Sequence, residues 1–189
     1  MRITGGDWRS RRLKGPGRGN RRLRPTPDAM RERAFAVLGD RVAGAMVLDL
    51  FAGTGAVGLE ALSRGAARAV FVERDHIAAR LVEANCEALC GSSGRARVLR
   101  RPARTAVEEL AAAGERFSLA WADPPFESWQ EGLEALVAAF STGALEPGAT
   151  ACLECPARAD VEGSLPERLE IERDLAGGAS RVVLLRRRS

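Results

Sequence analysis

A strand-like apolar run in this sequence ends in an acid, two prolines and an aromatic ring. Residues 117–122 (FSLAWA) lead directly into Asp123, Pro124, Pro125 and Phe126. The prolines fix φ and keep neighbouring oxygen acceptors aimed in one direction. A carboxylate and a backbone carbonyl held in this way can accept hydrogen bonds from an amine, and an aromatic ring can stack on a planar base. The segment therefore indicates chemistry on the exocyclic amine of a nucleobase.

A second chemical motif lies earlier in the chain, where Gly53, Gly55 and Gly58 form a GxGxxG pattern. The pattern falls between an expected strand and an expected helix, so that the turn and the free N–H groups of the helix N-terminus can approach a ligand closely. Glu73 follows about 20 residues after the loop begins, where a carboxylate can hold ribose hydroxyls. We expect a nucleotide-like ligand at this turn.

A glycine turn of this kind suits NAD or S-adenosylmethionine, and Asp49 discriminates between these two cofactors. It comes just before the glycines, where a carboxylate would repel the pyrophosphate of NAD but attract the cationic amino-acid end of S-adenosylmethionine. A role as a hydrogen-bond acceptor that stabilises the loop is compatible with either cofactor. With S-adenosylmethionine, the amine attacks the sulfonium methyl and needs no strong general base, so His76, the only histidine, is expected on the surface.

Strands and helices alternate over most of the chain, which predicts a doubly wound, mostly parallel α/β sheet of the Rossmann-like class. Ligands of such sheets bind beyond the carboxyl ends of the strands, where the strand order reverses, so the two motifs should face each other.

Local signals predict the individual elements. Ser128 and Glu131 predict a capping box for the helix after Phe126. A Gly-Gly turn at 177–178 predicts a closing antiparallel hairpin of residues 168–175 and 180–187. The other expected strands are 45–51, 68–73, 95–99, 117–122 and 145–155, and the other expected helices are 24–40, 56–65, 75–90 and 103–114.

The charge of the chain is concentrated at its N-terminus. Residues 1–24 contain nine basic residues and one acid, Asp7, whereas the remainder has 20 basic and 24 acidic residues. This asymmetry predicts a polyanionic partner, with nucleic acid the first candidate and a membrane surface the second. We expect a small basic β-hairpin arm over residues 1–24 and one catalytic domain over residues 25–189. The predicted RNA contacts are Arg9, Arg11, Arg12, Lys14, Arg21, Arg22 and Arg24.

The four cysteines do not predict a metal site. Cys152 and Cys155 form a CxxC in an expected strand, where side chains three apart point to opposite faces. Cys86 and Cys90 fall in an amphipathic helix, where reduced cysteine is usually a small buried hydrophobe. Because no apolar run long enough to cross a membrane and no signal peptide are visible, we expect a cytoplasmic protein without a membrane segment.

Four segments together resemble the RsmD family, bacterial methyltransferases that act on the 2-amino group of guanine in 16S ribosomal RNA. They are DLFAGTGAVGLEALSRGA, VFVERD, RPTPDAMRERAF and ADPPFE, and RITGGDWRSRRL resembles the family's basic N-terminal hairpin. The resemblance implies a class I S-adenosylmethionine-dependent methyltransferase, a monomer, that acts on ribosomal RNA, free or in a small-subunit assembly particle. It implies a catalytic tetrad of Asp123 to Phe126 and a cofactor site of Thr26, Asp49, Phe51, Ala52, Gly53, Gly55, Glu73, Arg74 and Ala103.

One position departs from the family pattern. Pro102 stands where the family usually has an Asp or Asn that meets the cofactor adenine, so this contact would fall to backbone groups near Ala103. Three alternative functions remain open. They are methylation of an adenine or cytosine amine in DNA or RNA, a nicotinamide-dependent oxidoreductase, and a non-catalytic RNA-binding module.

Overall fold

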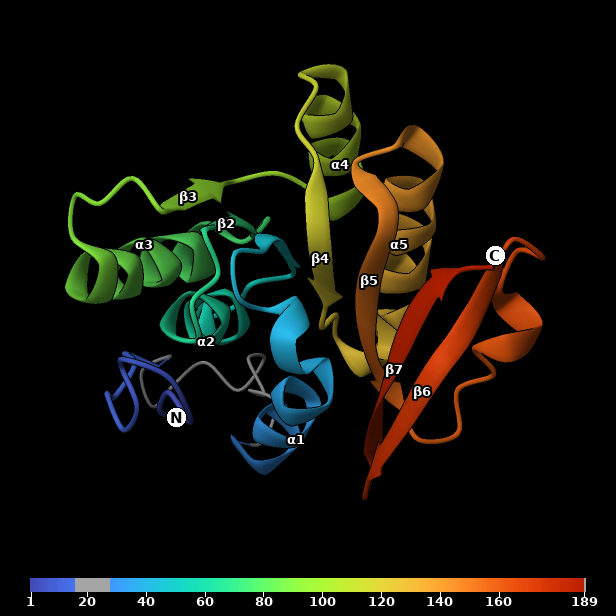
Figure 1. The fold of residues 1–189 in the computed structure, drawn as a ribbon, viewed down its shortest axis with the longest axis horizontal. Helices are drawn as coiled ribbons and strands as arrows, with labels where there is room; N and C mark the ends of the chain where they lie inside the picture. Colours follow the sequence, from blue (N-terminus) through green and yellow to red (C-terminus); the bar gives the residue numbers. More distant parts are fainter. Residues whose placement is uncertain (16–27, 189) are drawn as a thin grey trace.

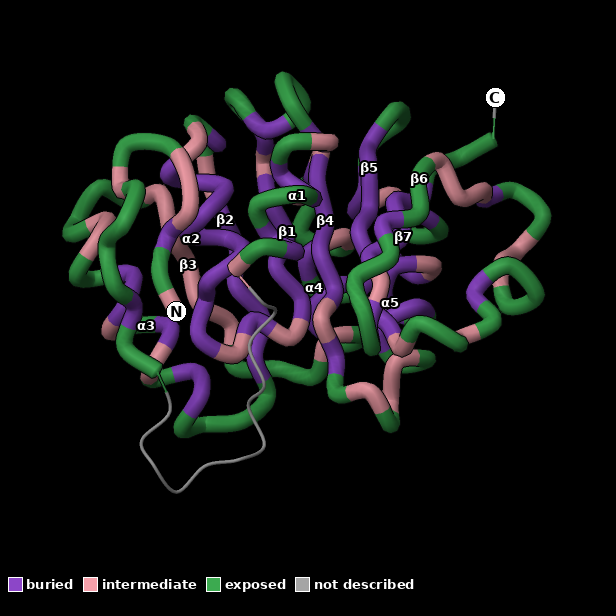
Figure 2. The backbone as a smooth tube through the Cα atoms, turned by 90° about the horizontal axis from the view of Figure 1, so that it is seen from below, coloured by how far each residue is buried: buried purple, intermediate pink, exposed green. Residues whose placement is uncertain are grey.

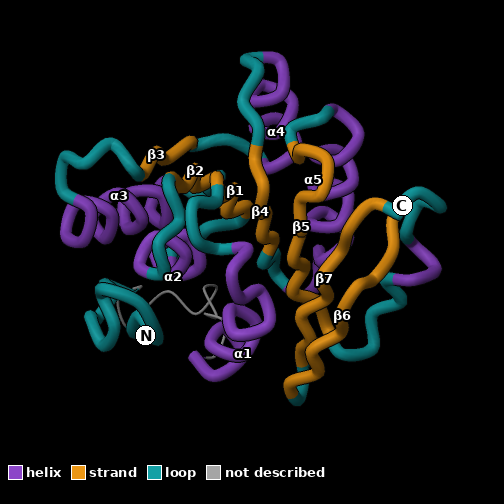
Figure 3. Tube along the Cα trace, viewed as in Figure 1, coloured by secondary structure: helices purple, strands orange, loops and turns teal. Residues whose placement is uncertain are grey.

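The computed structural model describes residues 1–15 and 28–188, and its centre is a seven-stranded sheet in the order β3-β2-β1-β4-β5-β7-β6. Figure 3 shows the strands in this order from left to right. Strands β1 to β5 pair in parallel, which confirms the predicted doubly wound sheet. The order reverses between β1 and β4, so a ligand crevice is expected beyond the carboxyl ends of these two strands. The strands are β1 (Met46–Leu50), β2 (Arg68–Val72), β3 (Ala96–Leu99), β4 (Phe117–Ala122), β5 (Leu145–Pro156), β6 (Leu169–Gly177) and β7 (Ser180–Arg187).

Helices cover both faces of the sheet (Figure 1), as the crossovers of a parallel sheet require. The α-helices are α1 (Asp28–Leu38), α2 (Ala56–Ser63), α3 (His76–Cys90), α4 (Ala103–Ala112) and α5 (Trp129–Thr142). Short 3₁₀ turns η1 (Gly39–Arg41) and η2 (Phe126–Ser128) separate α1 from β1 and β4 from α5, and a third, η3 (Glu162–Ser164), lies between β5 and β6. No helix within residues 1–15 and 28–188 combines the length and the apolar character needed to cross a bilayer.

Alternate residues of each strand enter two different apolar cores, because successive side chains of a strand point to opposite faces. Helices α1, α2 and α3 pack on one core, which includes Trp121, and α4 and α5 pack on the other, which includes Leu153. Cys152 lies in the first core and Cys155 in the second, which confirms that they face opposite sides of β5. Figure 2 shows that the central strands are buried along most of their length.

The closing hairpin of β6 and β7 is present, and its turn differs by one residue from the sequence prediction. Strand β7 lies between β5 and β6 and is antiparallel to both, so β6 is the edge strand. Gly177 still pairs with Ser180, and the turn consists of Gly178 and Ala179. The predicted Gly177–Gly178 turn is wrong by one residue. Gly178 has a positive φ, so the glycine that the turn needs is the second of the pair.

Residues 1–15 fold back on themselves and pack on the domain. An isolated antiparallel bridge joins Arg2 to Arg12, so the two ends of this segment lie side by side. Ile3 is fully buried and Leu13 is 8% exposed, and both belong to the core of α1, α2 and α3. The segment is therefore docked against the fold, whereas the division of the chain near residue 24 lies outside the described residues.

Candidate functional site

The two motifs lie on adjacent strands at the same edge of the sheet. Strands β1 and β4 pair in parallel, with Leu50 opposite Ala122. The Asp123 N–H donates to the Leu50 carbonyl with an N···O distance of 3.4 Å, so the register continues one residue beyond β4. Phe51 begins the glycine turn directly after Leu50. The start of the acid-proline segment and the start of the glycine turn are therefore neighbours at the point where the strand order reverses.

The glycine turn has a backbone that only a few residue types adopt easily. Gly53 and Gly55 both have a positive φ, in the left-handed region that favours glycine. Phe51 also has a positive φ, which is uncommon for an aromatic residue and marks local strain. Ala52 fixes the turn from within, because its N–H donates to Val72 and its carbonyl accepts from Gly55. The turn is thus bonded to β2 and closed by a hydrogen bond of its own.

Asp49 lies inside the fold beneath this turn. Its carboxylate is buried, and Oδ2 accepts the Gly58 N–H at 2.9 Å. The pKa of Asp49 is raised to about 7, chiefly by burial; the Gly58 N–H opposes this rise and the nearby Glu73 carboxylate adds to it. The structure therefore shows the loop-stabilising hydrogen bond that the sequence analysis gave as a second possible role of Asp49. A buried carboxyl of this kind gains most from a cation placed beside it.

Gly58 permits close packing between α2 and β2. A Cβ added there would lie 2.3 Å from Cε1 of Phe71, which is far below van der Waals contact. The third glycine of the pattern therefore serves the contact between helix and strand, as in other dinucleotide-type turns. The position of the Gly58 N–H, and with it the bond to Asp49, depends on this close approach.

Glu73 follows the end of β2 and joins the second strand to the glycine turn. Its Oε2 accepts the Gly53 N–H at 2.9 Å and its Oε1 accepts the Asp75 N–H at 2.8 Å. Each carboxylate oxygen has further acceptor capacity beyond one such bond. Glu73 is thus held next to the turn and retains the capacity to accept ribose hydroxyls.

The acid-proline segment is supported from behind by α5. Pro124 is buried, and a Cβ on Gly132 of α5 would lie 2.7 Å from the Pro124 Cγ. The absence of a side chain at Gly132 therefore allows the helix to pack directly on the prolines. Asp123 and Phe126 are half-buried, whereas Pro125 is exposed. A half-buried ring at the start of η2 retains surface on which a base can stack.

The predicted capping box at the start of α5 is wrong. The Ser128 side chain makes no capping bond, and its hydroxyl donates to the Pro125 carbonyl at 3.4 Å. Glu131 instead accepts from Arg74 at 3.4 Å. The 3₁₀ turn that precedes α5 diverts the serine from the geometry that a capping box needs. The ion pair with Glu131 also places the guanidinium of Arg74, a predicted cofactor residue, against α5.

The remaining predicted residues lie in three places. Ala103 begins α4 beyond the carboxyl end of β3 and is half-buried, and Pro102 precedes it as the N-cap residue. The predicted RNA contacts Arg9, Arg11, Arg12 and Lys14 are exposed, and none of their side chains forms an ion pair with another described residue. Thr26, Arg21, Arg22 and Arg24 lie outside the described residues.

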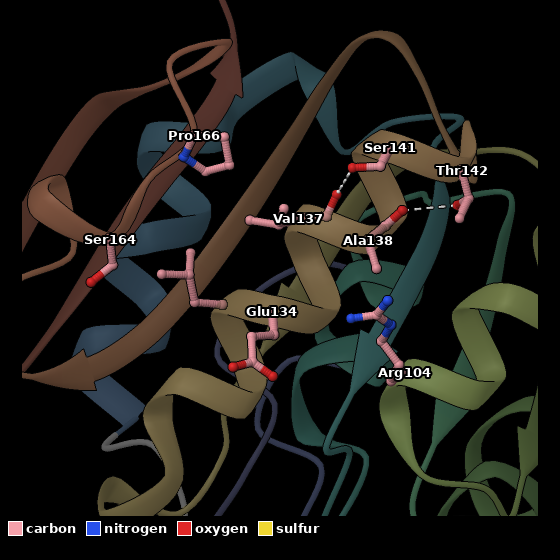
Figure 4. Close-up of a pocket in the computed structure, with 9 residues that line it drawn as sticks. Arg104, Glu134, Val137, Ala138, Ser141, Thr142, Ser164 and Pro166 are labelled. Carbon is pink, nitrogen blue, oxygen red and sulfur yellow. Dashed lines mark hydrogen bonds between the residues drawn. The ribbon is translucent and has the colours of Figure 1, made fainter.

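A shallow hollow of about 230 Å³ lies away from both motifs, on the outer face of α5 near α4 and η3 (Figure 4). Its apolar lining includes Leu133 and Val137. The Ser141 and Thr142 hydroxyls at its rim donate to helix carbonyls four residues earlier, at 2.6 and 2.9 Å. These two hydroxyls thus bond within α5, and none of the predicted site residues lines the hollow.

Two polar groups that the sequence analysis missed hold residues 1–15 to the domain. One is a buried ion pair of Arg31 and Glu60, whose side chains are both fully buried. Glu60 also accepts from the Thr4 N–H, the Thr4 hydroxyl and Arg64. The other is Asn85 of α3, which bonds both residues 1–15 and the glycine turn. In the sequence, an asparagine on the apolar face of an amphipathic helix was the signal that could have indicated this contact.

Comparison with known proteins identifies the family. The family model described as "Conserved hypothetical protein 95" matches residues 1–186. The chain belongs to the RsmD family. It is 41% identical over 126 residues to Ribosomal RNA small subunit methyltransferase D of Escherichia coli K12, and 35% identical over 126 residues to the protein of that name in Haemophilus influenzae. These matches cover 67% of this chain, and they span 60% and 64% of the two relatives.

Two solved structures resemble this chain over nearly its whole length. The structure of the Escherichia coli protein yhhF has a TM-score of 0.80 at 34% identity and covers 100% of this chain and 98% of its own. A hypothetical protein of Thermus thermophilus has a TM-score of 0.75 at 33% identity and covers 97% and 98%. The sheet order and the similarity to solved methyltransferase structures agree with the class I methyltransferase fold that the sequence predicted.

Proposed function

We propose that this chain transfers a methyl group from S-adenosylmethionine to the 2-amino group of a guanine in 16S ribosomal RNA. The observation that carries the proposal is the bond from the Asp123 N–H to the Leu50 carbonyl. It makes the acid-proline segment and the glycine turn neighbours at the reversal point of the sheet, where donor and acceptor must meet. Family membership and the names of the relatives support ribosomal RNA as the substrate.

The residues at the turn fit S-adenosylmethionine. Gly53 and Gly55, both with a positive φ, have no side chain that would keep a ligand away from their backbone, and Glu73 keeps acceptor capacity for ribose hydroxyls. The buried Asp49 carboxyl suits the ammonium group of the methionine end, because a neighbouring cation stabilises its charged form. S-adenosylmethionine supplies an electrophilic methyl on a sulfonium, which becomes a neutral thioether when the methyl leaves.

The acid-proline segment would prepare the attacking amine. The lone pair of a guanine amine is delocalised into the ring, so the amine is a poor nucleophile. A carboxylate of Asp123 and the carbonyl of Pro124 would both accept its N–H groups and favour a tetrahedral nitrogen with an available lone pair. As the new N–C bond forms, the nitrogen becomes acidic and loses one proton to solvent. Phe126 would stack on the base.

The exposed cations of residues 1–15 would bind the phosphates of the RNA. Arg9, Arg11, Arg12 and Lys14 face solvent without an ion pair among the described residues, so they are available to a polyanion. Phosphate contacts position a nucleic acid, and the pocket selects the base. Because a stacked guanine cannot reach a pocket of this kind, an unpaired or flipped guanine is the expected target.

The decisive experiment is analysis of methylated nucleosides in 16S ribosomal RNA from cells lacking this gene and from cells that carry it. We expect N2-methylguanosine to disappear at one position and to return with the wild-type gene. Asp123→Ala should fail to restore it, whereas Glu127→Ala, an exposed neighbour in η2, should restore it. A missing methyl on adenine or cytosine would assign the same chemistry to another amine.

Two assays separate the proposal from functions of other classes. A nicotinamide-dependent oxidoreductase would be stabilised against heat by NADH, whereas a methyltransferase would be stabilised by S-adenosylmethionine or its product. A non-catalytic RNA-binding module would show no turnover with a labelled methyl donor. We expect turnover in the wild type and a loss of about 100-fold or more in kcat for Asp123→Ala, the size typical of a lost transition-state contact.

A further inference from the structure

Asn85 of α3 contacts both the basic N-terminal segment, which is proposed to bind RNA, and the glycine turn, which is proposed to bind the cofactor. Its Oδ1 accepts the Lys14 N–H at 2.8 Å, and its Nδ2 donates to the Lys14 carbonyl at 3.0 Å. The other Nδ2 hydrogen goes to the Thr54 carbonyl at 2.9 Å. Lys14 belongs to the basic N-terminal segment, and Thr54 stands between Gly53 and Gly55 in the glycine turn. One buried side chain therefore joins the proposed RNA-binding segment to the proposed cofactor turn.

The geometry of this contact leaves Asn85 little freedom. The residue is 2% exposed, and both hydrogens of its amide are used, one for each segment. Its bonds to the Lys14 N–H and carbonyl reproduce the pairing that a neighbouring strand would offer. If the amide rotated with a movement of one segment, its hydrogen bond to the other segment would break. Because the amide is buried, no water could replace the lost bond.

We infer that Asn85 is a positioning residue that couples cofactor binding to RNA binding, so that occupancy of either site strengthens the other. This inference rests on the proposed function. A ligand on the glycine turn fixes the Thr54 carbonyl, and the fixed carbonyl holds the Asn85 amide in the orientation that pairs with Lys14. Ordering of Lys14 then reduces the entropy that the basic segment loses when it binds RNA. By linkage, RNA strengthens cofactor binding by the same factor.

Ser63 provides a matched control for this coupling. Its Oγ accepts the Trp8 N–H at 2.9 Å and donates to the Gly5 carbonyl at 2.7 Å, so it also anchors residues 1–15 by two bonds. None of the hydrogen bonds described for Ser63 reaches the glycine turn. Loss of Ser63 should loosen the segment without changing its communication with the cofactor, whereas loss of Asn85 should change both.

The first test needs only the wild-type chain and S-adenosylhomocysteine. Hydrogen exchange measured by NMR should show the Lys14 amide slowed at least fivefold by saturating S-adenosylhomocysteine. The Trp8 amide, which donates to Ser63, should change by less than twofold. An unchanged Lys14 amide in protein that has bound S-adenosylhomocysteine would overturn the inference and leave the proposed function intact. Absence of S-adenosylhomocysteine binding would overturn both.

The second test measures the coupling by calorimetry with a 16S ribosomal RNA transcript. The Kd for S-adenosylhomocysteine should fall at least fivefold when the transcript is present. Asn85→Ala should reduce this factor to less than twofold, whereas Ser63→Ala should keep it even if the transcript binds less tightly. A wild-type factor in Asn85→Ala, or a lost factor in Ser63→Ala, would show that Asn85 does not carry the coupling.

Discussion

The buried carboxyl of Asp49 predicts that cofactor binding depends on pH near neutrality. Its pKa is raised to about 7 from an ordinary value of 3.8, chiefly by burial, and its proposed partner is the ammonium of the methionine end. If only the ionised carboxyl binds this cation well, the affinity for S-adenosylhomocysteine follows the ionised fraction. That fraction rises about 15-fold between pH 5.5 and 7.0 for a pKa near 7 and is nearly constant above pH 8.

Three comparisons isolate Asp49 in this experiment. Asp49→Asn keeps an oxygen to accept the Gly58 N–H but carries no charge, so its affinity should vary little with pH. Methylthioadenosine lacks the amino-acid end, so its binding to the wild type should also vary little. His76→Gln removes the only imidazole of the chain and should leave the wild-type pH curve in place. Calorimetry at each pH gives the Kd values.

A wild-type pH curve in Asp49→Asn, or the same rise with methylthioadenosine, would refute the proposed contact between Asp49 and the ammonium group. Either result would leave Asp49 only the loop-stabilising bond to Gly58.

The raised pKa of Asp49 also affects folding, but here a rise in pH lowers stability, whereas it raises the affinity for the cofactor. A carboxyl that binds its proton more tightly when folded stabilises the fold below pH 4, and this contribution, roughly 4 kcal/mol for three pKa units, is lost as the pH rises through 7. Relative to Asp49→Asn, the unliganded wild type should thus lose thermal stability between pH 4 and 7.

Three further substitutions test the packing and the proposed base contact. Gly58→Ala places a Cβ 2.3 Å from Phe71, so the free energy of unfolding in urea should fall by about 1–3 kcal/mol, with partial recovery when Phe71→Leu is added. Glu60→Gln removes the fully buried member of the two carboxylates that pair with Arg31, the other being Asp28, and should cost about 1–3 kcal/mol by thermal denaturation. An unchanged stability would contradict this role. Phe126→Ala should weaken binding of guanine-containing RNA by about 1–3 kcal/mol, while S-adenosylhomocysteine affinity and the binding of Phe126→Trp to RNA stay near wild type.

The parts of the fold that the sequence predicted correctly are those governed by local periodicity. Alternating apolar runs placed β1 to β5 and the helices between them, because a buried parallel strand and an amphipathic helix each have their own period. The same period placed Cys152 and Cys155 on opposite faces of β5. The glycine pattern correctly indicated the turn, since positive φ values leave few residue choices.

The errors arose where two local signals competed. Both Gly177 and Gly178 suit a turn, and the choice depends on the register between β6 and β7, which long-range pairing sets. Ser128 and Glu131 have capping-box spacing, but the 3₁₀ turn at Phe126 redirects the serine and Arg74 attracts the glutamate. The order of β6 and β7 in the sheet was not predicted, because it depends on long-range pairing that no local pattern contains.

The polar residues that sequence reasoning missed share one location, the contact between residues 1–15 and the domain. All eight residues of α2 are buried, because the sheet covers one face of this helix and residues 1–15 cover the other. A periodic pattern assigns the polar face of a helix to solvent, so Glu60 would be placed on the surface although it is fully buried. The N-terminal segment buries Ile3 and Leu13, and it is also held by hydrogen bonds to Glu60, Ser63 and Asn85. Such bonds require one register between the segment and the helices. A basic segment that slid along α2 would lose these bonds, so polar anchoring keeps its arginines at a fixed place relative to the glycine turn.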